Sequence, residues 1–170
     1  MKSTFLYLII FVFSLNANAQ ITKAEIVATG LTCSMCSNAI NKQLKALAGV
    51  EKVETDLNTN TFTVFIKKDA TITPRILKDR VEKAGFFVGS MVVTMSFENL
   101  KITDNLSVNE NKLSLIFIDS KPKTLNGEVK LKILDKGFVT QKEFKKLSKL
   151  YAKYTSYSYE NEDNYHIKPI

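Results

Sequence analysis

The sequence predicts an α+β fold, in which a four-stranded sheet with two covering helices is followed by a smaller β-rich module with one helix. Three observations support this prediction. Between residues 24 and 94, four short runs have the alternating apolar side chains of strands. Two longer runs in the same region have apolar residues at helical spacing. From residue 95 onwards, strand-like runs precede a single helical stretch.

The first strand is expected at residues 24–30, where apolar and polar side chains alternate loosely. A helix follows from Ser34, because apolar residues then recur at helical spacing. Gly49 is expected to end this helix, since glycine readily adopts the left-handed conformation found just after helices. The apolar face of the expected helix consists of Ala39, Ile40, Leu44, Leu47 and Ala48.

Residues 50–57 and 61–67 are expected to pair as a β-hairpin. The turn between them is Asn58-Thr59-Asn60, although it lacks the glycine that such turns usually contain. In the second of these strands, alternate apolar side chains predict one face. They are Phe62, Val64 and Ile66.

The second helix is expected to begin at Thr73-Pro74, with threonine as the N-cap and proline at the first helical position. Gly85 ends it, and a fourth strand covers residues 86–94. The resulting order is β-α-β-β-α-β. This is the split β-α-β arrangement of a ferredoxin-like sandwich, in which two helices cover one face of a four-stranded antiparallel sheet.

Residues 95–170 are expected to form the small β-rich C-terminal module with one helix. Strand-like runs occur at residues 113–119 and 127–134, and Asp135-Lys136-Gly137 makes a turn. The helix is expected at residues 141–154, with Thr140 as its cap. The tail that follows is rich in Tyr and Asn and lacks clear periodicity. The tyrosines of this end of the chain are expected to cover a small core, with an interaction surface as the alternative. They are Tyr151, Tyr154, Tyr157, Tyr159 and Tyr165.

The N-terminus has the features of a secretory signal peptide. Lys2 supplies a positive charge, residues 5–15 are almost entirely apolar, and Ala17-Asn18-Ala19 is a small-x-small cleavage signal. The apolar run is too short to cross a bilayer, and no later stretch is long or apolar enough. We therefore expect residues 1–19 to be removed near Ala19, leaving a periplasmic or secreted protein that does not span the membrane.

Composition argues against several classes of function. The 170 residues carry a formal net charge of +7, but the lysines are scattered, so nucleic-acid binding is not expected. No glycine-rich phosphate loop occurs. The single histidine, His166, lies in the tail, where we expect it to be solvated, so a Ser-His-Asp arrangement is not expected. The sequence therefore predicts a protein that is not an enzyme.

Cys33 and Cys36 are the only cysteines, and they lie where the first strand gives way to the first helix. A disulfide at this spacing cross-links almost nothing, so the pair is expected to act chemically. A pair of thiolates selects soft ions such as Cu(I), Zn(II), Cd(II) or Hg(II). Two ligands are too few for a structural zinc site, but they suit Cu(I) or Hg(II). The positive end of the helix favours the thiolate of Cys36, whereas Met35, between the ligands, is expected to point away.

The segment Gly30-Leu31-Thr32-Cys33-Ser34-Met35-Cys36 resembles the Gly-Met-Thr-Cys-x-x-Cys loop of the heavy-metal-associated (HMA) domain. This family includes copper chaperones, N-terminal domains of copper-transporting ATPases and the periplasmic mercury-binding protein. Gly49-Val50 and Ala84-Gly85-Phe86 extend the resemblance, which covers about residues 23–92. It implies an HMA domain at residues 21–94, metal ligation by Cys33 and Cys36, and Phe86 near the site. Residues 95–170 lie outside the resemblance.

We therefore expect an exported protein that binds one soft cation, with Cu(I) first and Hg(II), Zn(II) and Cd(II) as alternatives. It would serve as a chaperone or as a scavenger. A chaperone would pass the ion by ligand exchange to a membrane transporter or efflux component. The chief rival is a thiol–disulfide oxidoreductase, whose CxxC pair also lies between a strand and a helix. Such sites usually carry an aromatic residue before the first cysteine, where this chain has Thr32.

Overall fold

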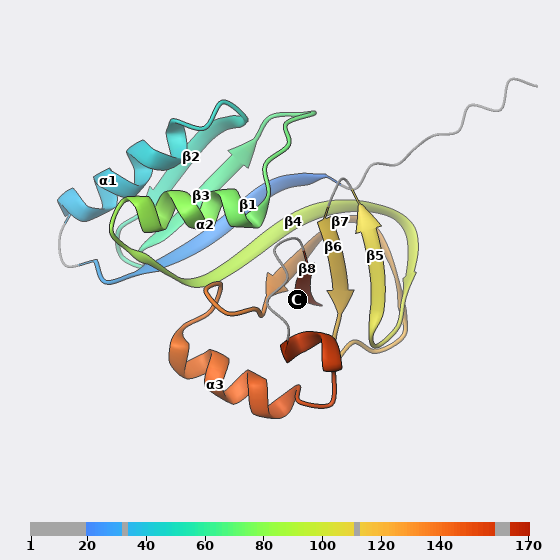
Figure 1. The fold of residues 1–170 in the computed structure, drawn as a ribbon. Helices are drawn as coiled ribbons and strands as arrows, with labels where there is room; N and C mark the ends of the chain where they lie inside the picture. The colour runs from blue at the N-terminus through green and yellow to red at the C-terminus, as the bar shows by residue number, and fades with distance from the viewer. Residues whose placement is uncertain (1–19, 32–33, 111–112, 159–163) are drawn as a thin grey trace, which may run out of the picture.

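The computed structural model describes residues 20–31, 34–110, 113–158 and 164–170. The strands in these ranges are β1 (Ile21–Thr29), β2 (Val50–Asp56), β3 (Thr61–Ile66), β4 (Phe87–Ile102), β5 (Leu106–Glu110), β6 (Leu113–Phe117), β7 (Lys123–Ile133) and β8 (Asn164–Pro169). The helices there are α1 (Ser34–Lys45), α2 (Pro74–Lys83), α3 (Gln141–Leu150) and the short 3-10 helix η1 (Thr155–Ser158). The strands form one mixed sheet in the order β2-β3-β1-β4-β7-β8-β6-β5 (Figure 1).

The first half confirms the predicted ferredoxin-like arrangement. β2, β3, β1 and β4 are neighbours in that order, and they pair antiparallel. Helices α1 and α2 lie on the same face of these strands (Figure 1). Leu44 of α1 and Leu77 of α2 are both 0% exposed, and they belong to the same core cluster as Phe62 of β3. The face of β3 predicted from its alternating side chains is therefore the buried one.

The ends of α2 also agree with the prediction. The hydroxyl of Thr73 accepts the backbone N–H of Ile76 at 3.3 Å, and Pro74 occupies the first helical position. Gly85 has a φ of +89°, the left-handed conformation that glycine adopts without strain. The sequence signals at both ends of this helix therefore act as expected.

Gly49 has a different role from the one predicted. Helix α1 already ends at Lys45, and Gly49 does not have a positive φ. A Cβ atom at this position would lie 2.8 Å from Cβ of Ala70 and from Cγ1 of Ile72. The expectation that Gly49 ends the helix was wrong. The glycine is needed because the segment leading to α2 packs against the backbone there.

Strand β4 continues well beyond the predicted end at residue 94. It has 16 residues and reaches Ile102, because its second half pairs with β7. A register shift between Phe97 and Leu100 bends the ladder. Met95, Phe97 and Ile102 are buried in this extension. The residue at which the first module was expected to end thus lies inside a strand that is shared by both halves.

The C-terminal half is β-rich with one α-helix, as expected, but it contains two strands that were not predicted. These are β5 and β8, and β8 lies between β6, to which it is parallel, and β7, to which it is antiparallel. Helix α3 is capped by Thr140 and ends at Leu150, earlier than predicted. In β8 the consecutive residues Tyr165, His166 and Ile167 are all buried, at 1%, 1% and 0% exposure. Since both faces of β8 are covered, its side chains show no alternation.

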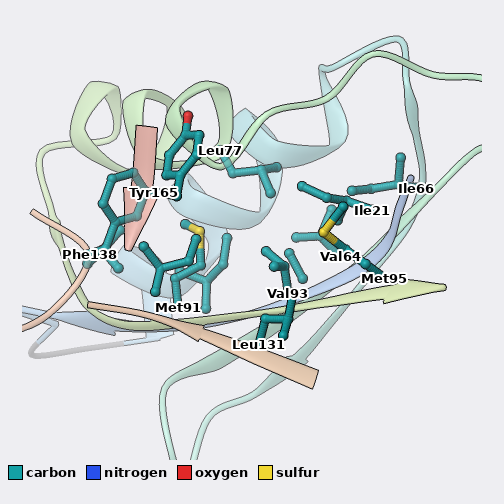
Figure 2. Packing of buried hydrophobic residues seen from close by; sticks show 14 of the residues in the cluster. Ile21, Val64, Ile66, Leu77, Met91, Val93, Met95, Leu131, Phe138 and Tyr165 are labelled. Atoms are coloured by element: carbon teal, nitrogen blue, oxygen red, sulfur yellow. The ribbon is translucent and has the colours of Figure 1, made fainter. Parts of the chain in front are cut away.

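The main hydrophobic core crosses from one half to the other. Figure 2 shows Val64 and Leu77 of the first half in the same layer as Leu131, Phe138 and Tyr165 of the second half. A smaller cluster packs beside α3, and it confirms the expected covering role for three tyrosines. Tyr165 belongs to the main core instead, and Tyr159 lies outside the described residues. The smaller cluster contains Ile116, Ile118, Leu134, Tyr151, Tyr154 and Tyr157, with Phe144 and Leu147 packed against them.

Candidate metal site

The predicted metal loop connects β1 to α1. Cys33 lies outside the described residues, whereas Cys36 is half-buried in the first turn of α1, as expected. No acidic residue occupies this first turn. The positive end of the helix is therefore not offset by a carboxylate from that turn, which favours a thiolate there. The ligand assignment to Cys33 and Cys36 stays a prediction.

The residues around the loop hold its ends in place. Gly30 has a φ of +87°, so the chain turns sharply as it leaves β1. Leu31 and Phe86 are partly buried and pack against the main core. A Cβ atom at Gly30 would lie 3.9 Å from Cδ1 of Phe86, so this ring lies next to the start of the loop, as the resemblance implied. Met35 is 81% exposed, so most of its side chain faces solvent.

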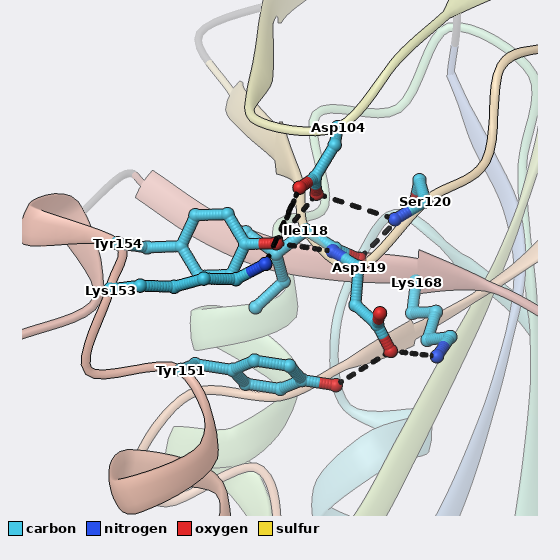
Figure 3. A network of polar contacts seen from close by, with 8 residues as sticks. All are labelled: Asp104, Ile118, Asp119, Ser120, Tyr151, Lys153, Tyr154 and Lys168. Atoms are coloured by element: carbon cyan, nitrogen blue, oxygen red, sulfur yellow. Dashed lines mark hydrogen bonds and ion pairs between the residues drawn. The ribbon is translucent and has the colours of Figure 1, made fainter.

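The described ranges contain no group of three or more His, Cys, Asp or Glu residues that is arranged to hold a metal ion. The carboxylates that do approach one another have other partners. In a polar cluster of the C-terminal half, the hydroxyl of Tyr154 lies 2.7 Å from both carboxylate oxygens of Asp104 and accepts the N–H of Asp119 at 3.1 Å (Figure 3). Lys168 forms an ion pair with the carboxylate of Asp119.

These contacts lower the pKa values of both carboxyl groups, Asp104 and Asp119. The hydrogen bond from Tyr154 lowers the pKa of Asp104 below its ordinary value. The hydrogen bond from Lys168 lowers the pKa of Asp119. Each carboxylate is thus held in its charged form by a protein donor, and the cluster ties the segment after β4 to the ends of β6, α3 and β8.

The prediction for His166 was wrong. The residue lies in β8 and is only 1% exposed, because the tail that contains it inserts into the sheet. Its Nδ1 atom is 2.6 Å from Oδ1 of Asp135, and its Nε2 atom is 3.0 Å from Oγ of Ser156. The structure thus assembles a Ser-His-Asp constellation, contrary to the prediction from the sequence. Its members are separated by 31 and 10 positions, so no local motif signals it.

Comparisons with known proteins identify the first half. The profile of the heavy-metal-associated domain family matches residues 26–87. This segment is a heavy-metal-associated domain. The matched range contains the β1–α1 loop with both cysteines and ends at Phe87. The resemblance noted in the sequence is therefore confirmed, and the HMA domain is related to parts of copper-transporting proteins.

Two curated relatives show this relationship. A copper-transporting ATPase of Saccharomyces cerevisiae is 44% identical over 57 residues, which are 34% of this chain and 6% of the ATPase. A copper-exporting P-type ATPase of Staphylococcus epidermidis is 29% identical over 109 residues, 64% of this chain and 14% of the relative. The chain thus spans only a small part of the length of these ATPases. In the described ranges, no helix is long and apolar enough to cross a membrane.

Two solved structures are each similar to part of this chain. The yeast copper transporter domain CCC2A is 39% identical, with a TM-score of 0.35, and the match covers 38% of this chain and 86% of that domain. The CopZ metallochaperone is 23% identical, with a TM-score of 0.36, and the match covers 39% of this chain and 97% of the chaperone.

Proposed function

We propose that this chain is an exported copper-binding protein, in which the thiolates of Cys33 and Cys36 hold one Cu(I) ion. The observation that carries the proposal is the location of Cys36 in the first turn of α1, inside an HMA domain related to parts of copper-transporting ATPases. Soft thiolate ligands select Cu(I), and a site with two sulfur ligands matches its low coordination number. Hg(II), Zn(II) and Cd(II) are the competing ions.

Such a site suits transfer of the ion. Two protein ligands leave a coordination position open, so a thiolate of an acceptor enters before the donor leaves. We propose that the acceptor is a membrane transporter or efflux component, and that a chain without such an acceptor acts as a scavenger. Ligand exchange requires no catalysed covalent step, so this role is not enzymatic. The predicted signal peptide at residues 1–19 supports export to the periplasm or beyond.

The test is a competition titration with Cu(I) under anaerobic conditions, using the reduced chain from residue 20. The wild type is expected to bind one ion. Cys33→Ser and Cys36→Ser should each weaken binding by more than about 100-fold, since removing even a group that only orients a ligand costs about 10–100-fold. Met35→Leu is the matched control and should bind like the wild type, because Met35 is 81% exposed.

Two results would overturn this assignment. Full Cu(I) affinity in Cys36→Ser would remove Cys36 from the ligand set. Efficient catalysis of thiol–disulfide exchange by the wild type, together with a weakly held Cu(I) ion, would favour the oxidoreductase. Parallel titrations with Hg(II), Zn(II) and Cd(II) determine which ion the site prefers.

A further inference from the structure

The Ser-His-Asp constellation of the C-terminal half has the connectivity of an activated nucleophile. We propose that Ser156 accepts acyl or phosphoryl groups from small uncharged esters, with His166 as its base and Asp135 as the group that orients the imidazole. Ser156 comes from η1, His166 from β8, and Asp135 from the turn after β7. The site lies outside the HMA domain, so the proposal does not depend on metal binding.

The hydrogen-bond partners of His166 favour one tautomer of its neutral imidazole. An ionised carboxylate only accepts hydrogen bonds, so Nδ1 of His166 donates to Oδ1 of Asp135 across 2.6 Å. In the neutral imidazole, Nε2 is then the acceptor, and the hydroxyl of Ser156 donates to it across 3.0 Å. This is the direction in which a base removes the proton of a nucleophile.

A backbone hydrogen bond also fixes the position of His166 relative to Asp135. Oδ2 of Asp135 accepts the backbone N–H of His166 at 2.7 Å, while Oδ1 is left for the imidazole. Asp135 therefore holds both the strand and the ring of the same residue. A rigidly held imidazole keeps the distance between base and nucleophile short, which a general base requires.

The side chains of the base and of the orienting carboxylate are less exposed than a freely solvated group, while the serine is partly exposed. The side chain of His166 is 2% exposed and that of Asp135 is 20% exposed, so the base is largely shielded from water. Ser156 is half-buried, so part of this residue faces solvent.

The surroundings indicate the class of ester. The ring of Tyr157 packs edge-on against the imidazole, with centroids 5.0 Å apart, and Phe144 lies against Tyr157 at 6.0 Å. The hydroxyl of Tyr157 donates to the carbonyl of Leu134 at 2.6 Å, so this group is already satisfied. Tyr157 is buried and Phe144 is half-buried, so the imidazole has apolar neighbours, and a charged group beside them would be costly. We therefore assign an uncharged acyl or alkoxy group to the ester.

With an ester, the Oγ atom of Ser156 attacks the acyl carbon or the phosphorus and its proton moves to Nε2 of His166. The bond to the alkoxy oxygen breaks, and the alcohol leaves with that proton. A fluorophosphonate ester reports on an activated serine by the same attack. The Oγ atom of Ser156 attacks phosphorus, so that an O–P bond forms and the P–F bond breaks. Fluoride leaves, and the hydroxyl proton moves to Nε2 of His166. No oxidant or further reactant is required.

The test treats the chain from residue 20 with a fluorophosphonate and maps the product by peptide mass spectrometry. Label is expected on Ser156, and it should be absent in Ser156→Ala. Ser148 is the matched control, since it is also half-buried but its hydroxyl donates to the carbonyl of Lys145. Ser156 should be labelled at least about 100-fold faster than Ser148, the low end of what a positioned base contributes.

Asp135→Asn separates an orienting role from a merely structural one. Asparagine keeps the size of the side chain and an oxygen for the N–H of His166, but its amide group donates toward Nδ1. The other tautomer then forms, in which Nε2 carries the proton and no longer accepts from Ser156. Labelling should fall by at least about 100-fold, while the circular dichroism spectrum stays that of the wild type.

Three results would overturn the proposal. They are the absence of label on Ser156 in the wild type, labelling of Ser156 no faster than that of Ser148, and unchanged labelling in a folded Asp135→Asn variant. The first two are measured in the wild type, so they decide the matter even if a variant fails to fold.

Discussion

The two halves of the chain assemble their reactive groups in different ways. In the first half, Cys33 and Cys36 are three positions apart in the sequence, and Cys36 lies in the first turn of α1. In the second half, Asp135, Ser156 and His166 come from three elements, and Asp135 and His166 are 31 positions apart. The first arrangement needs only a local turn of backbone. The second exists only because β8 inserts between β6 and β7.

The halves nevertheless share one sheet and one main core. β4 pairs with β1 through its first part and with β7 through its second part. The main core contains Phe62 of the first half and Phe117 of the second. The difference in local chemistry is therefore not matched by a physical separation, and we expect the described part of the chain to unfold as one unit.

The largest expected effect is on stability, and it tests whether the two halves unfold together. Phe62→Ala and Phe117→Ala remove fully buried rings, one from each half, since both are 0% exposed. Each should lower the free energy of unfolding by about 3–5 kcal/mol, because the apolar contacts are lost and a cavity forms. Urea denaturation followed by circular dichroism should show a single transition that both changes shift.

Leu150→Ala is the control for this pair, because Leu150 is 64% exposed. It should change the free energy of unfolding by no more than about 0.5 kcal/mol. Two separate transitions, of which Phe117→Ala moves only one, would show that the halves unfold independently despite the shared strand.

A smaller expected effect is a change in the pH dependence of the free energy of unfolding. It concerns the second half alone, because the polar cluster around Asp104 lies there. Tyr154→Phe removes the hydrogen bond that lowers the pKa of Asp104. It should cost about 1 kcal/mol at pH 7, since the bond involves a charged but largely solvated group. A lowered pKa means that this stabilisation is present at neutral pH and is lost as the pH falls below about 4.

The measurement is the difference in the free energy of unfolding between the wild type and Tyr154→Phe at pH 7 and at pH 3. The difference should shrink at the lower pH. Tyr151→Phe is the comparison, because its hydroxyl lies 3.5 Å from Oδ2 of Asp119 and its loss should cost less. A difference for Tyr154→Phe that grows toward pH 3 would contradict the assigned direction of the pKa shift.

The smallest expected effect compares one helix cap from each half. Thr73 caps α2 and Thr140 caps α3, and each hydroxyl accepts a backbone N–H, at 3.3 Å and 3.2 Å respectively. Thr73→Ala and Thr140→Ala should each cost about 1 kcal/mol, measured by thermal or urea unfolding. The corresponding serine variants keep the hydroxyl and should retain most of the stability. A much larger loss for one alanine variant would assign that threonine a role beyond capping.

Much of the first half was predictable because its signals are local. Thr73-Pro74 and Gly85 mark the ends of α2, and the alternation in β3 identifies its buried face. Gly49 was misinterpreted, because the close approach of Ala70 and Ile72 cannot be seen in the sequence around the glycine. The position of Cys36 at the start of α1 was predicted correctly.

The second half was less predictable for an equally physical reason. β8 is buried on both faces, so Tyr165, His166 and Ile167 show neither the alternation of a half-exposed strand nor the polarity of a tail. The extension of β4 was missed because it depends on pairing with β7, which lies more than twenty positions further along the chain.

The sequence by itself determined the class of the first half and the thiol pair, because strands, caps and a CxxC spacing are properties of short segments. Only the tertiary structure decided that β4 joins both halves into one sheet and that Asp135, Ser156 and His166 meet. Contacts between residues distant in sequence depend on which strands become neighbours. The order of the strands in the sheet results from burying the apolar faces of all the elements together. No single segment of the sequence contains that information.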